Sequence, residues 1–466
     1  MGNNAFPTQE LNPLCSKIGS GATPRGGSKV YLDRGEIALI RSQNVRNEHF
    51  EQSGIVFIEQ KHADQLANVI VEKGDVLLNI TGDSVARCCQ VDSNFLPARV
   101  NQHVAIIRPK PERLDDRFLR YFLISPFMQN LMLSWAGSGG TRDALTKGMI
   151  ESFKVPLPPL SEQKAIAHVL GSLDDRIELN RRMNETLESM AQALFKSWFV
   201  DFDPVIDNAL AGGKEIPAEL SEKAQTRAAL GDKRRPLPEE IRALFPDEFT
   251  FSDELGWIPK GWEVVQIKKF GKVTTGKTPP KKIEQAFSDT EVPFITPSDI
   301  DNSIFVVSTD RYLSSDGEAA IRNSFIQSGT ICVTCIGSQM GKTVITTKDS
   351  YTNQQINSVS VEDVQSRNYL FFNLRNRREE IFTIGSSGST MPIINKSTFE
   401  RLLVLLPGEE VLKIFNELTT SFLDSVLSNE LYSLSLSGSR NILLPKLLSG
   451  EVRIPDAEKM VEELSL

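Results

Sequence analysis

Ser20-Gly21-Ala22-Thr23-Pro24 recurs 255 residues later as Thr275-Gly276-Lys277-Thr278-Pro279, and this repeat decides the fold. At the same offset, the strand-like stretch IALIRSQNV from Ile37 corresponds to VPFITPSDI from Val292. Self-similarity at one long offset is typical of a duplicated structural unit. We therefore expect two related domains in the chain.

Later blocks keep the same order while the offset shrinks. KGDVLLNITG from Lys73 corresponds to SGTICVTCIG from Ser328, and each is an apolar run closed by glycine, as in a buried strand that enters a turn. Asn101-Gln102 then corresponds to Asn353-Gln354 at 252 residues. The last pair is GGTRDALTKGMIESFKVPLP from Gly139 and GSTMPIINKSTFERLLVLLP from Gly388, at 249 residues. Loops absorb insertions more readily than helices and strands, so the drift indicates two copies with different loop lengths.

The first half ends in a predicted long helix from Ser161 to Phe199. This segment contains no proline and one glycine, and it starts with Ser-Glu-Gln shortly after two prolines, as a capped helix does. Asn180 and Asn184 fall inside its apolar seam, where a buried Asn fixes register. The three-four spacing of the seam is followed by Leu170, Leu173, Ile177, Leu187, Ala191, Leu194 and Trp198.

The second half is predicted to end in a helix from Glu409 to about Ser437, with a break at Gly438 before the terminal LLPKLLSGEVRI. We expect the apolar stripe of this helix to pack against the apolar stripe of the first long helix, because exposure of either stripe to water is unfavourable. Two independent amphipathic helices, each on its own domain, are the alternative. The second stripe comprises Phe415, Leu418, Phe422, Leu423, Val426, Leu427, Leu431 and Leu434.

Length, composition and charge exclude several classes of protein. The 466 residues predict two or three folding units, and 40% hydrophobic with 24% charged residues is globular rather than collagenous or disordered. A formal net charge of −8 argues against coating nucleic acid by bulk electrostatics, although local basic patches stay open. Five scattered cysteines indicate reduced thiols. Without an export signal or an apolar span in the sequence, we expect a cytoplasmic protein.

The most suggestive catalytic motif is Gly337-Ser338-Gln339-Met340-Gly341-Lys342-Thr343, which resembles a phosphate-binding loop. Such a loop needs four residues between its glycines and a helix after it, whereas this one has three and precedes a strand-like alternation. The cofactor loop and catalytic tetrapeptide of an adenine or cytosine methyltransferase are also missing from the sequence. A hydrolase that uses Lys342 is nevertheless one alternative function, and a scaffold whose domains bind protein is another.

Two further groups of residues are spaced like metal ligands. Cys332 and Cys335 form a CxxC, but all four histidines lie in the other half, so we predict two core thiols on opposite faces of a strand. Asp201, Asp203 and Asp207 are expected to be solvated carboxylates at a helix end, because nothing in the sequence completes a nuclease site around them. We therefore predict no metal site.

Polar, donor-rich loops recur in both halves and suit contacts with base edges and phosphates. Arg pairs well with guanine, and Asn or Gln with adenine, in the major groove. For any single residue, plain surface is the alternative. The candidate DNA contacts of the first half are Thr23, Arg25, Arg41, Gln43, Asn44, Asn101, Gln102, His103, Thr141 and Arg142. Those of the second half are Lys277, Lys281, Lys282, Ser298, Lys342, Asn353, Gln354 and Thr390.

Three stretches carry a resemblance to a known family. They are PLPPLSEQKAIAHVLGSLDDRIELNRRMNETLESMAQALFKSWFVDFDPV from Pro156, LGWIPKGWEV from Leu255 and LLPKLLSGEVRI from Leu443. Together they resemble the conserved regions of type I restriction-modification specificity subunits, and the resemblance spans essentially the whole chain. It implies a non-catalytic DNA-reading subunit with two target-recognition domains, each of which reads one half of a bipartite target.

The resemblance also implies partners and an architecture. The fold class is α+β, with two tandem mixed α/β domains separated by two long antiparallel coiled-coil helices in a pseudo-two-fold duplication. The helices, residues 161–199 and 409–450, set the spacer between half-sites and dock the methylation subunits. Expected partners are double-stranded DNA, two methylation subunits and two restriction subunits, with no membrane. S-adenosylmethionine, ATP and Mg are used by those partners, and none is bound by this chain.

These observations predict five segments along the chain. The first recognition domain is expected at 1–160 and the second at 257–408. The central helix covers 161–203, and the C-terminal helix and tail cover 409–466. Between them, 204–256 is a connecting insertion rich in Ala, Glu, Lys and Pro, with no counterpart after the second helix.

Overall fold

The computed structural model describes residues 6–47, 49–137, 143–231, 237–386 and 392–463. The chain divides into two compact units, a first unit of Met1–Asn180 with Tyr432–Leu466 and a second unit of Arg181–Leu431. Both divisions fall inside long helices, α5 (Leu160–Phe195) and α13 (Glu409–Ser449), so each unit contains part of both. Within the described ranges, no helix is both long and apolar enough to cross a membrane.

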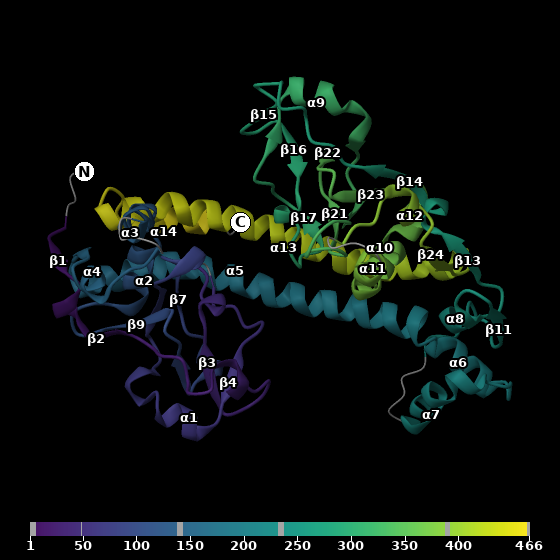
Figure 1. Ribbon diagram of the computed structural model, residues 1–466, viewed down its shortest axis with the longest axis horizontal. Helices are drawn as coiled ribbons and strands as arrows, with labels where there is room; N and C mark the ends of the chain where they lie inside the picture. The colour runs from purple at the N-terminus through teal and green to yellow at the C-terminus, as the bar shows by residue number, and fades with distance from the viewer. Residues whose placement is uncertain (1–5, 48, 138–142, 232–236, 387–391, 464–466) are drawn as a thin grey trace. The chain divides into compact units, whose positions relative to one another are not determined.

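The first unit contains two four-stranded sheets (Figure 1). One is antiparallel, in the order β2 (Cys15–Ser20), β9 (Val104–Pro109), β6 (Val76–Asn79) and β7 (Cys88–Gln90). The other has the order β4 (Val56–Ile58), β3 (Ile37–Ile40), β8 (Ala98–Val100) and β5 (Ile70–Val71), with β3 parallel to β8. Strand β6 is apolar because it is buried on both faces: Val76 and Leu78 belong to one core cluster and Leu77 to another.

The second unit repeats both strand orders and adds one edge strand to each sheet. Its first sheet runs β14 (Gly271–Thr275), β23 (Ile356–Val361), β20 (Ile331–Thr334), β21 (Thr343–Thr346) and β17 (Phe305–Val306). The other runs β15 (Phe287–Ser288), β18 (Tyr312–Leu313), β16 (Val292–Ile295), β22 (Ser350–Thr352) and β19 (Phe325–Ile326), with β16 parallel to β22. The predicted duplication is therefore confirmed at the level of strand order.

Short helices and one two-stranded ribbon accompany the sheets of each unit. In the first unit these are α1 (Gln60–Asp64), α2 (Asp116–Ile124), α3 (Pro126–Gly137), α4 (Lys147–Glu151) and the β1 (Thr8–Glu10) and β10 (Lys154–Pro156) pair. In the second they are α9 (Ser315–Ile321), α10 (Arg367–Asn376), α11 (Arg378–Ser386), α12 (Lys396–Glu400) and the β13 (Glu263–Gln266) and β24 (Leu403–Leu406) pair. Helices α2 and α10 contribute buried aromatic side chains to the larger core of their own unit.

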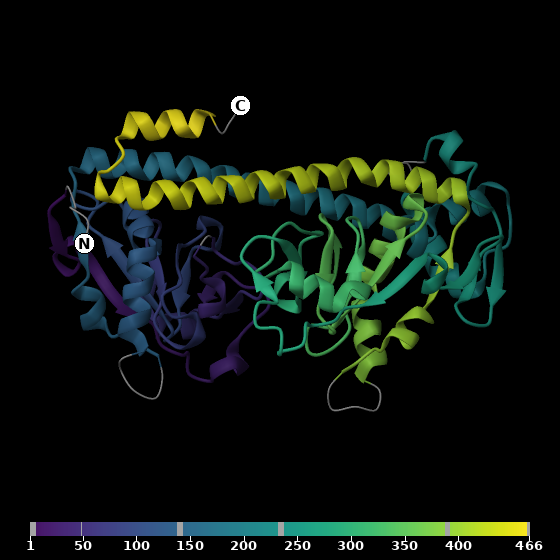
Figure 2. The ribbon, with the colours of Figure 1, turned by 90° about the horizontal axis from the view of Figure 1, so that it is seen from above.

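The long helix predicted from Ser161 to Phe199 is confirmed, since α5 continues into one π-helical turn at Lys196–Val200. Helix α13 lies beside it (Figure 2), and the contacts run antiparallel. In the first unit, Asn180 Nδ2 donates to Ser433 Oγ at 3.1 Å. In the second, Asn429 Nδ2 donates to Asn184 Oδ1 at 2.8 Å. Both predicted seam asparagines are buried, so each supplies a polar contact that fixes register.

The predicted break at Gly438 is wrong, because α13 runs unbroken from Glu409 to Ser449 with Pro445 inside it. A glycine inside a helix costs about 1 kcal/mol and a proline about 3 kcal/mol relative to alanine. Each fully buried leucine contributes about 2 kcal/mol in the opposite direction. The leucines of this segment that are buried in the core of the first unit are Leu436, Leu443, Leu444, Leu447 and Leu448. Packing therefore outweighs the local preference to break.

The predicted apolar stripe of the second helix is too broad. Phe415, Leu423 and Val426 are buried as expected, but Leu418 is 39% exposed and Leu431 and Leu434 are each 45% exposed. Eight apolar residues between 415 and 434 span more than one face of a helix, and one neighbouring helix covers only one face. The remainder forms exposed apolar surface.

The prediction of solvated carboxylates at Asp201, Asp203 and Asp207 is wrong, because Asp207 is buried and Asp201 and Asp203 are half-buried in ion pairs. Arg227, on α7 (Ser221–Ala229), binds Asp207 through two hydrogen bonds of 3.1 and 2.9 Å and lies 3.6 Å from Asp203. Asp207 is buried as a result. The connecting segment thus folds back on the end of α5. Its other elements are α6 (Asp203–Ala211), α8 (Glu239–Arg242), β11 (Phe249–Ser252) and β12 (Gly256–Pro259).

A short helix also follows the second long helix, within the predicted C-terminal tail. Helix α14 (Ile454–Glu463) comes after α13, as α6 comes after α5. It buries Ala457 and Val461 in the core of the first unit. The apolar spacing of these two residues, four apart on one helix face, accounts for its docking.

Three carboxyl groups of the second unit surround one arginine. Glu188 of α5 lies 3.1 Å from the Arg375 guanidinium of α10, and Arg375 also donates to the carbonyls of Asn302 and Ser303. Glu430 of α13 has a buried Oε2 without a hydrogen-bond partner among the described residues. Burial, Glu188 and Asp301 raise the pKa of Glu430 to about 8, against the smaller opposing effect of Arg375. Glu430 is therefore largely protonated at neutral pH.

We expect Glu430→Gln to stabilise the second unit at alkaline pH. A carboxyl pKa raised above its unfolded value of 4.5 gives a contribution to stability that is complete below pH 4.5 and lost as the pH rises toward 8. Glutamine does not titrate. At pH 9 the free energy of unfolding of the variant should therefore exceed that of the natural chain by about 2 kcal/mol, and at pH 5 the two values should be almost equal. Urea unfolding at both pH values measures this, with the exposed Glu417→Gln as control. A gap that does not change with pH would contradict it.

Candidate nucleic-acid interface

The strand order brings four loops of each unit to one edge of its sheets. In the first unit, parallel β3 and β8 end together, and antiparallel pairing places the ends of β2 and β6 beside the start of β9. The loops at this edge are 21–36, 41–55, 80–87 and 101–103. In the second unit they are 276–286, 296–304, 335–342 and 353–355. Every predicted contact residue within the described ranges lies on one of these loops, whereas Thr141, Arg142 and Thr390 lie outside the described residues.

A chain of hydrogen bonds ties three loops of the first unit together. Thr23 Oγ1 donates to Gln102 Oε1 at 2.6 Å, and Gln102 Nε2 lies 2.8 Å from His103 Nε2. His103 Nδ1 lies 2.5 Å from Thr81 Oγ1. If Gln102 donates, His103 accepts at Nε2 and carries its proton on Nδ1, from which it donates to Thr81. The network holds the polar side chains of the edge in one arrangement.

Three predicted contact residues are asparagines whose amide groups shape turns. Asn101 Oδ1 accepts a hydrogen bond from the backbone N–H of His103 at 3.1 Å, and Asn353 Oδ1 accepts one from the backbone N–H of Gln355 at 3.0 Å. Asn44 donates to the Glu51 carbonyl at 2.9 Å and accepts from the Arg41 amide at 3.0 Å. All three are buried. In this conformation they position their neighbours and leave little amide surface for a ligand.

Arg25, Arg41 and Gln43 lie at the same edge of the first unit. Arg41 and Gln43 both donate to the Gly54 carbonyl, and the Arg41 guanidinium lies 5.5 Å from the centre of the Tyr31 ring. Gln43 and Arg25 are exposed. A DNA base or phosphate can reach both of these exposed side chains.

The loop after β2 in the first unit and the loop after β14 in the second each carry three basic residues. Lys277, Lys281 and Lys282 are exposed on the loop after β14, where they can approach phosphates. Ser298 is also exposed, with its Oγ 2.7 Å from Thr296 Oγ1. The equivalent loop of the first unit carries Arg25, Lys29 and Arg34. Each of these two loops therefore has more basic than acidic residues, although the whole chain is acidic.

Lys342 is held by the protein rather than directed to a phosphate. Its Nζ donates to the Ile300 carbonyl at 2.9 Å, and burial, followed by Arg378, lowers its pKa. Strand β21 begins at Thr343, as the sequence predicts, where a phosphate-binding loop would need a helix. The prediction of two core thiols is also confirmed: Cys332 and Cys335 are buried in different core clusters, and burial raises the pKa of each thiol to about 12.

Gly21 and Gly276 explain the repeated pentapeptide. A Cβ on Gly21 would lie 1.8 Å from the Val100 carbonyl oxygen, and one on Gly276 would lie 2.0 Å from the Asn353 carbonyl oxygen. Only glycine lets the loop after β2 or β14 approach the turn between the two sheets so closely. The same approach brings Thr23 to Gln102 and Thr278 to Gln354, at 2.6 and 2.7 Å.

Two threonines of the networks are absent from the predicted contacts. Thr278 occupies the same place in the repeated pentapeptide as Thr23, so the repeat itself was sufficient to identify it. Thr81 follows β6, and the residue at the same position in the second copy, Ile336, is apolar. The repeat therefore gives no indication that Thr81 belongs to the network. The hydrogen bond between Thr81 and His103 arises from the strand order alone.

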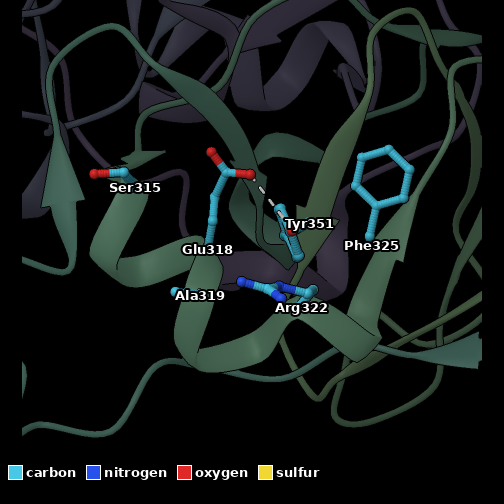
Figure 3. A pocket seen from close by; sticks show the side chains of 6 residues that line it. All are labelled: Ser315, Glu318, Ala319, Arg322, Phe325 and Tyr351. Carbon is cyan, nitrogen blue, oxygen red and sulfur yellow. Dashed lines mark hydrogen bonds between the residues drawn. The ribbon is translucent and has the colours of Figure 1, made fainter.

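A separate pocket lies on the second sheet of the second unit, beside β19 and β22. Figure 3 shows Glu318, Tyr351 and Arg322 around it, with Phe325 on the opposite side. Its volume is about 450 Å³, and its lining residues are Ser315, Glu318, Ala319, Arg322, Phe325 and Tyr351. The Tyr351 hydroxyl donates to Glu318 at 3.5 Å, and burial raises its pKa. None of the predicted contact residues lines this pocket.

Each unit also exposes apolar side chains on its part of the long helices. In the first unit Leu179, Leu434 and Ile442 are 57%, 45% and 62% exposed. In the second, Met183 and Met190 are 45% and 50% exposed. These side chains are apolar surface that a partner protein could bury favourably.

Comparisons with known proteins place both copies in one family. A family model described as Type I restriction modification DNA specificity domain matches residues 9–189 and 259–431. The chain is 32% identical over 440 residues to the type I restriction enzyme HindI specificity subunit of Haemophilus influenzae, with 89% of this chain and 94% of that protein covered. It is 24% identical over 447 residues to the MjaIX specificity subunit of Methanocaldococcus jannaschii, with 94% and 92% covered. The solved S subunit from M. genitalium has the same fold, with a TM-score of 0.53, 13% identity and 96% and 97% of the two chains covered.

Proposed function

Since the chain belongs to the type I restriction-modification DNA specificity family, we propose that it is the non-catalytic subunit that selects the DNA target for a methylating and cleaving complex. Each recognition domain, residues 1–160 and 257–408, reads one half of a bipartite target. The observation that carries this proposal is the duplicated edge, where the same loops and the same glycine-threonine-glutamine arrangement occur in both units.

The partners follow from the same premise. Two methylation subunits dock on the exposed apolar side chains of the long helices. Docking is favourable because it removes this apolar surface from water. Two restriction subunits complete the cleaving assembly in the cytoplasm. The partners use S-adenosylmethionine, ATP and Mg, and this chain supplies DNA recognition alone.

A genome-wide map of adenine methylation, with and without the gene for this chain, tests the proposal. We expect one split motif with a constant spacer to lose methylation when the gene is removed and to regain it when the gene is restored. A map that is identical in the two strains, in a host whose methylation subunit is active, would contradict the proposal. It would favour a scaffold whose domains bind protein.

The long helices are proposed to set the spacer between the half-sites. Insertion of four residues near Asn184 adds about one helical turn, or about 6 Å, and keeps the apolar face in phase. We expect the methylated motif to gain spacer length while both half-sites stay the same, because helices are stiff where loops are not. Sequencing of the methylated motif measures this. An unchanged spacer with full activity would contradict a role of the helices as a ruler.

A further inference from the structure

The duplication lets the two copies be compared position by position within one chain. At the edge, four polar positions are the same in both copies: Thr23 and Thr278, Asn47 and Asn302, Asn101 and Asn353, and Gln102 and Gln354. Other polar positions of the same loops differ: Arg41 against Thr296, Gln43 against Ser298, and His103 against Gln355. Side chains that read different bases must differ between the two domains. Side chains that contact a part of DNA common to both half-sites can be identical.

Of the identical groups, only the glutamines combine exposure with a held orientation. Asn101 and Asn353 are buried in their turns. Gln102 and Gln354 are exposed, and in each the side-chain oxygen accepts a hydrogen bond from the threonine hydroxyl, at 2.6 and 2.7 Å. The amide oxygen therefore faces the protein. One N–H of the Gln102 amide lies toward His103 Nε2, 2.8 Å away, and the second N–H is the group that a ligand at the edge can meet.

This orientation decides which part of DNA the glutamine suits. Reading adenine takes both ends of the amide, since the oxygen accepts from N6 and the nitrogen donates to N7. A glutamine whose oxygen is held by threonine offers mainly a donor. Phosphate oxygens accept from such a donor, and they are the same in every sequence.

We propose that Gln102 and Gln354 each donate Nε2 to a DNA phosphate oxygen and so place their domain in register on the duplex. Base reading falls to the exposed positions where the copies differ, such as Gln43 in the first domain and Ser298 in the second. Thr23 and Thr278 are positioning residues that orient the glutamine. This inference rests on the proposed function of the chain in DNA recognition.

The test uses the chain assembled with its methylation subunits and duplexes that carry the mapped target or one base-pair substitution in it. Gln102→Ala and Gln354→Ala should each weaken binding about tenfold, by the same factor for the target and for every substituted duplex, because a lost hydrogen bond to a charged group is worth about 1.5 kcal/mol. Gln43→Ala should instead lower discrimination at one base pair of one half-site.

A neutral phosphate analogue and a conservative variant complete the test. A methylphosphonate at the contacted phosphate should weaken binding of the natural chain and abolish the further effect of Gln102→Ala. Thr23→Ser keeps the hydroxyl and should bind like the natural chain, while Thr23→Val should weaken binding uniformly at an unchanged melting temperature. Loss of discrimination at a single base pair in Gln102→Ala, or unchanged affinity, would overturn the inference. If the natural complex does not prefer its target to the substituted duplexes, the proposed function itself fails before any variant is compared.

Discussion

Asp174→Ala is expected to destabilise the first unit by about 3–5 kcal/mol, because it removes the carboxylate that binds two buried arginines. Asp174 of α5 accepts from Arg120 and the Tyr121 hydroxyl of α2, each at 2.7 Å, and from Arg440 of α13 at 2.8 Å. The side chains of Arg120 and Arg440 are only 7% and 5% exposed. One carboxylate thus joins three helices of this unit.

Asp175→Ala provides the matched control one residue away. Asp175 pairs with Arg117 at 2.7 Å, but its side chain is 68% exposed, and exposed pairs contribute about 0.5 kcal/mol. Thermal and urea unfolding of the two variants should separate them clearly. Equal effects would show that the Asp174 cluster does not hold the helices together.

The Asp174 cluster also predicts a dependence on pH. Burial opposes ionisation of Asp174, but Arg120 and Arg440 outweigh it and lower the pKa of the carboxyl. A lowered carboxyl pKa gives a contribution to stability that is present above the unfolded value of 3.8 and lost as the pH falls through the folded value. The gap between the natural chain and Asp174→Ala should therefore narrow in acid.

Gly21→Ala should abolish recognition of one half-site. Its Cβ would lie 1.8 Å from the Val100 carbonyl oxygen, so the loop after β2 must move away from the turn that carries Gln102 and His103. We expect a loss of stability of about 3 kcal/mol, at the upper end of the range for overpacking, because the clash is with backbone. DNA affinity of the assembled complex should fall at least about a hundredfold, since register and several polar groups are lost together.

Gly19→Ala, two residues earlier and within β2, is the control. A Cβ at Gly19 meets nothing within 4 Å, so this variant should fold and bind DNA like the natural chain. Melting curves and DNA titrations of the two variants measure the difference. If Gly21→Ala retains full affinity, the close approach of the two loops has no part in recognition.

Sequence alone was sufficient for the features that depend on order along the chain. The duplication, the buried strand around Leu77 and the helix from Ser161 follow from repeats and local apolar spacing. The continuity of α13 through Gly438 could not be predicted in this way, because it depends on packing against core residues that lie elsewhere in the chain. The pairing of Asp207 with Arg227 was hidden by their separation of twenty residues.

The candidate interface shows the same limit. Within the part of the chain that the structure describes, the predicted polar residues do lie between the strands, and strand order gathers them at one edge in each unit. Which of them are buried in turns, as Asn44, Asn101 and Asn353 are, depends on contacts that no periodicity reveals. The Thr23–Gln102 bond joins residues 79 positions apart and emerges only from the parallel and antiparallel pairing of the strands.

The central claim is that each domain reads its own half of a bipartite target, and exchange of one domain tests it most directly. Residues 1–160 would be replaced by the corresponding domain of the HindI specificity subunit relative, and the methylated motif would be sequenced in cells that carry the methylation subunit. We expect one half-site to change while the other half-site and the spacer stay the same. A motif that is unchanged, or one in which both half-sites change, would contradict it.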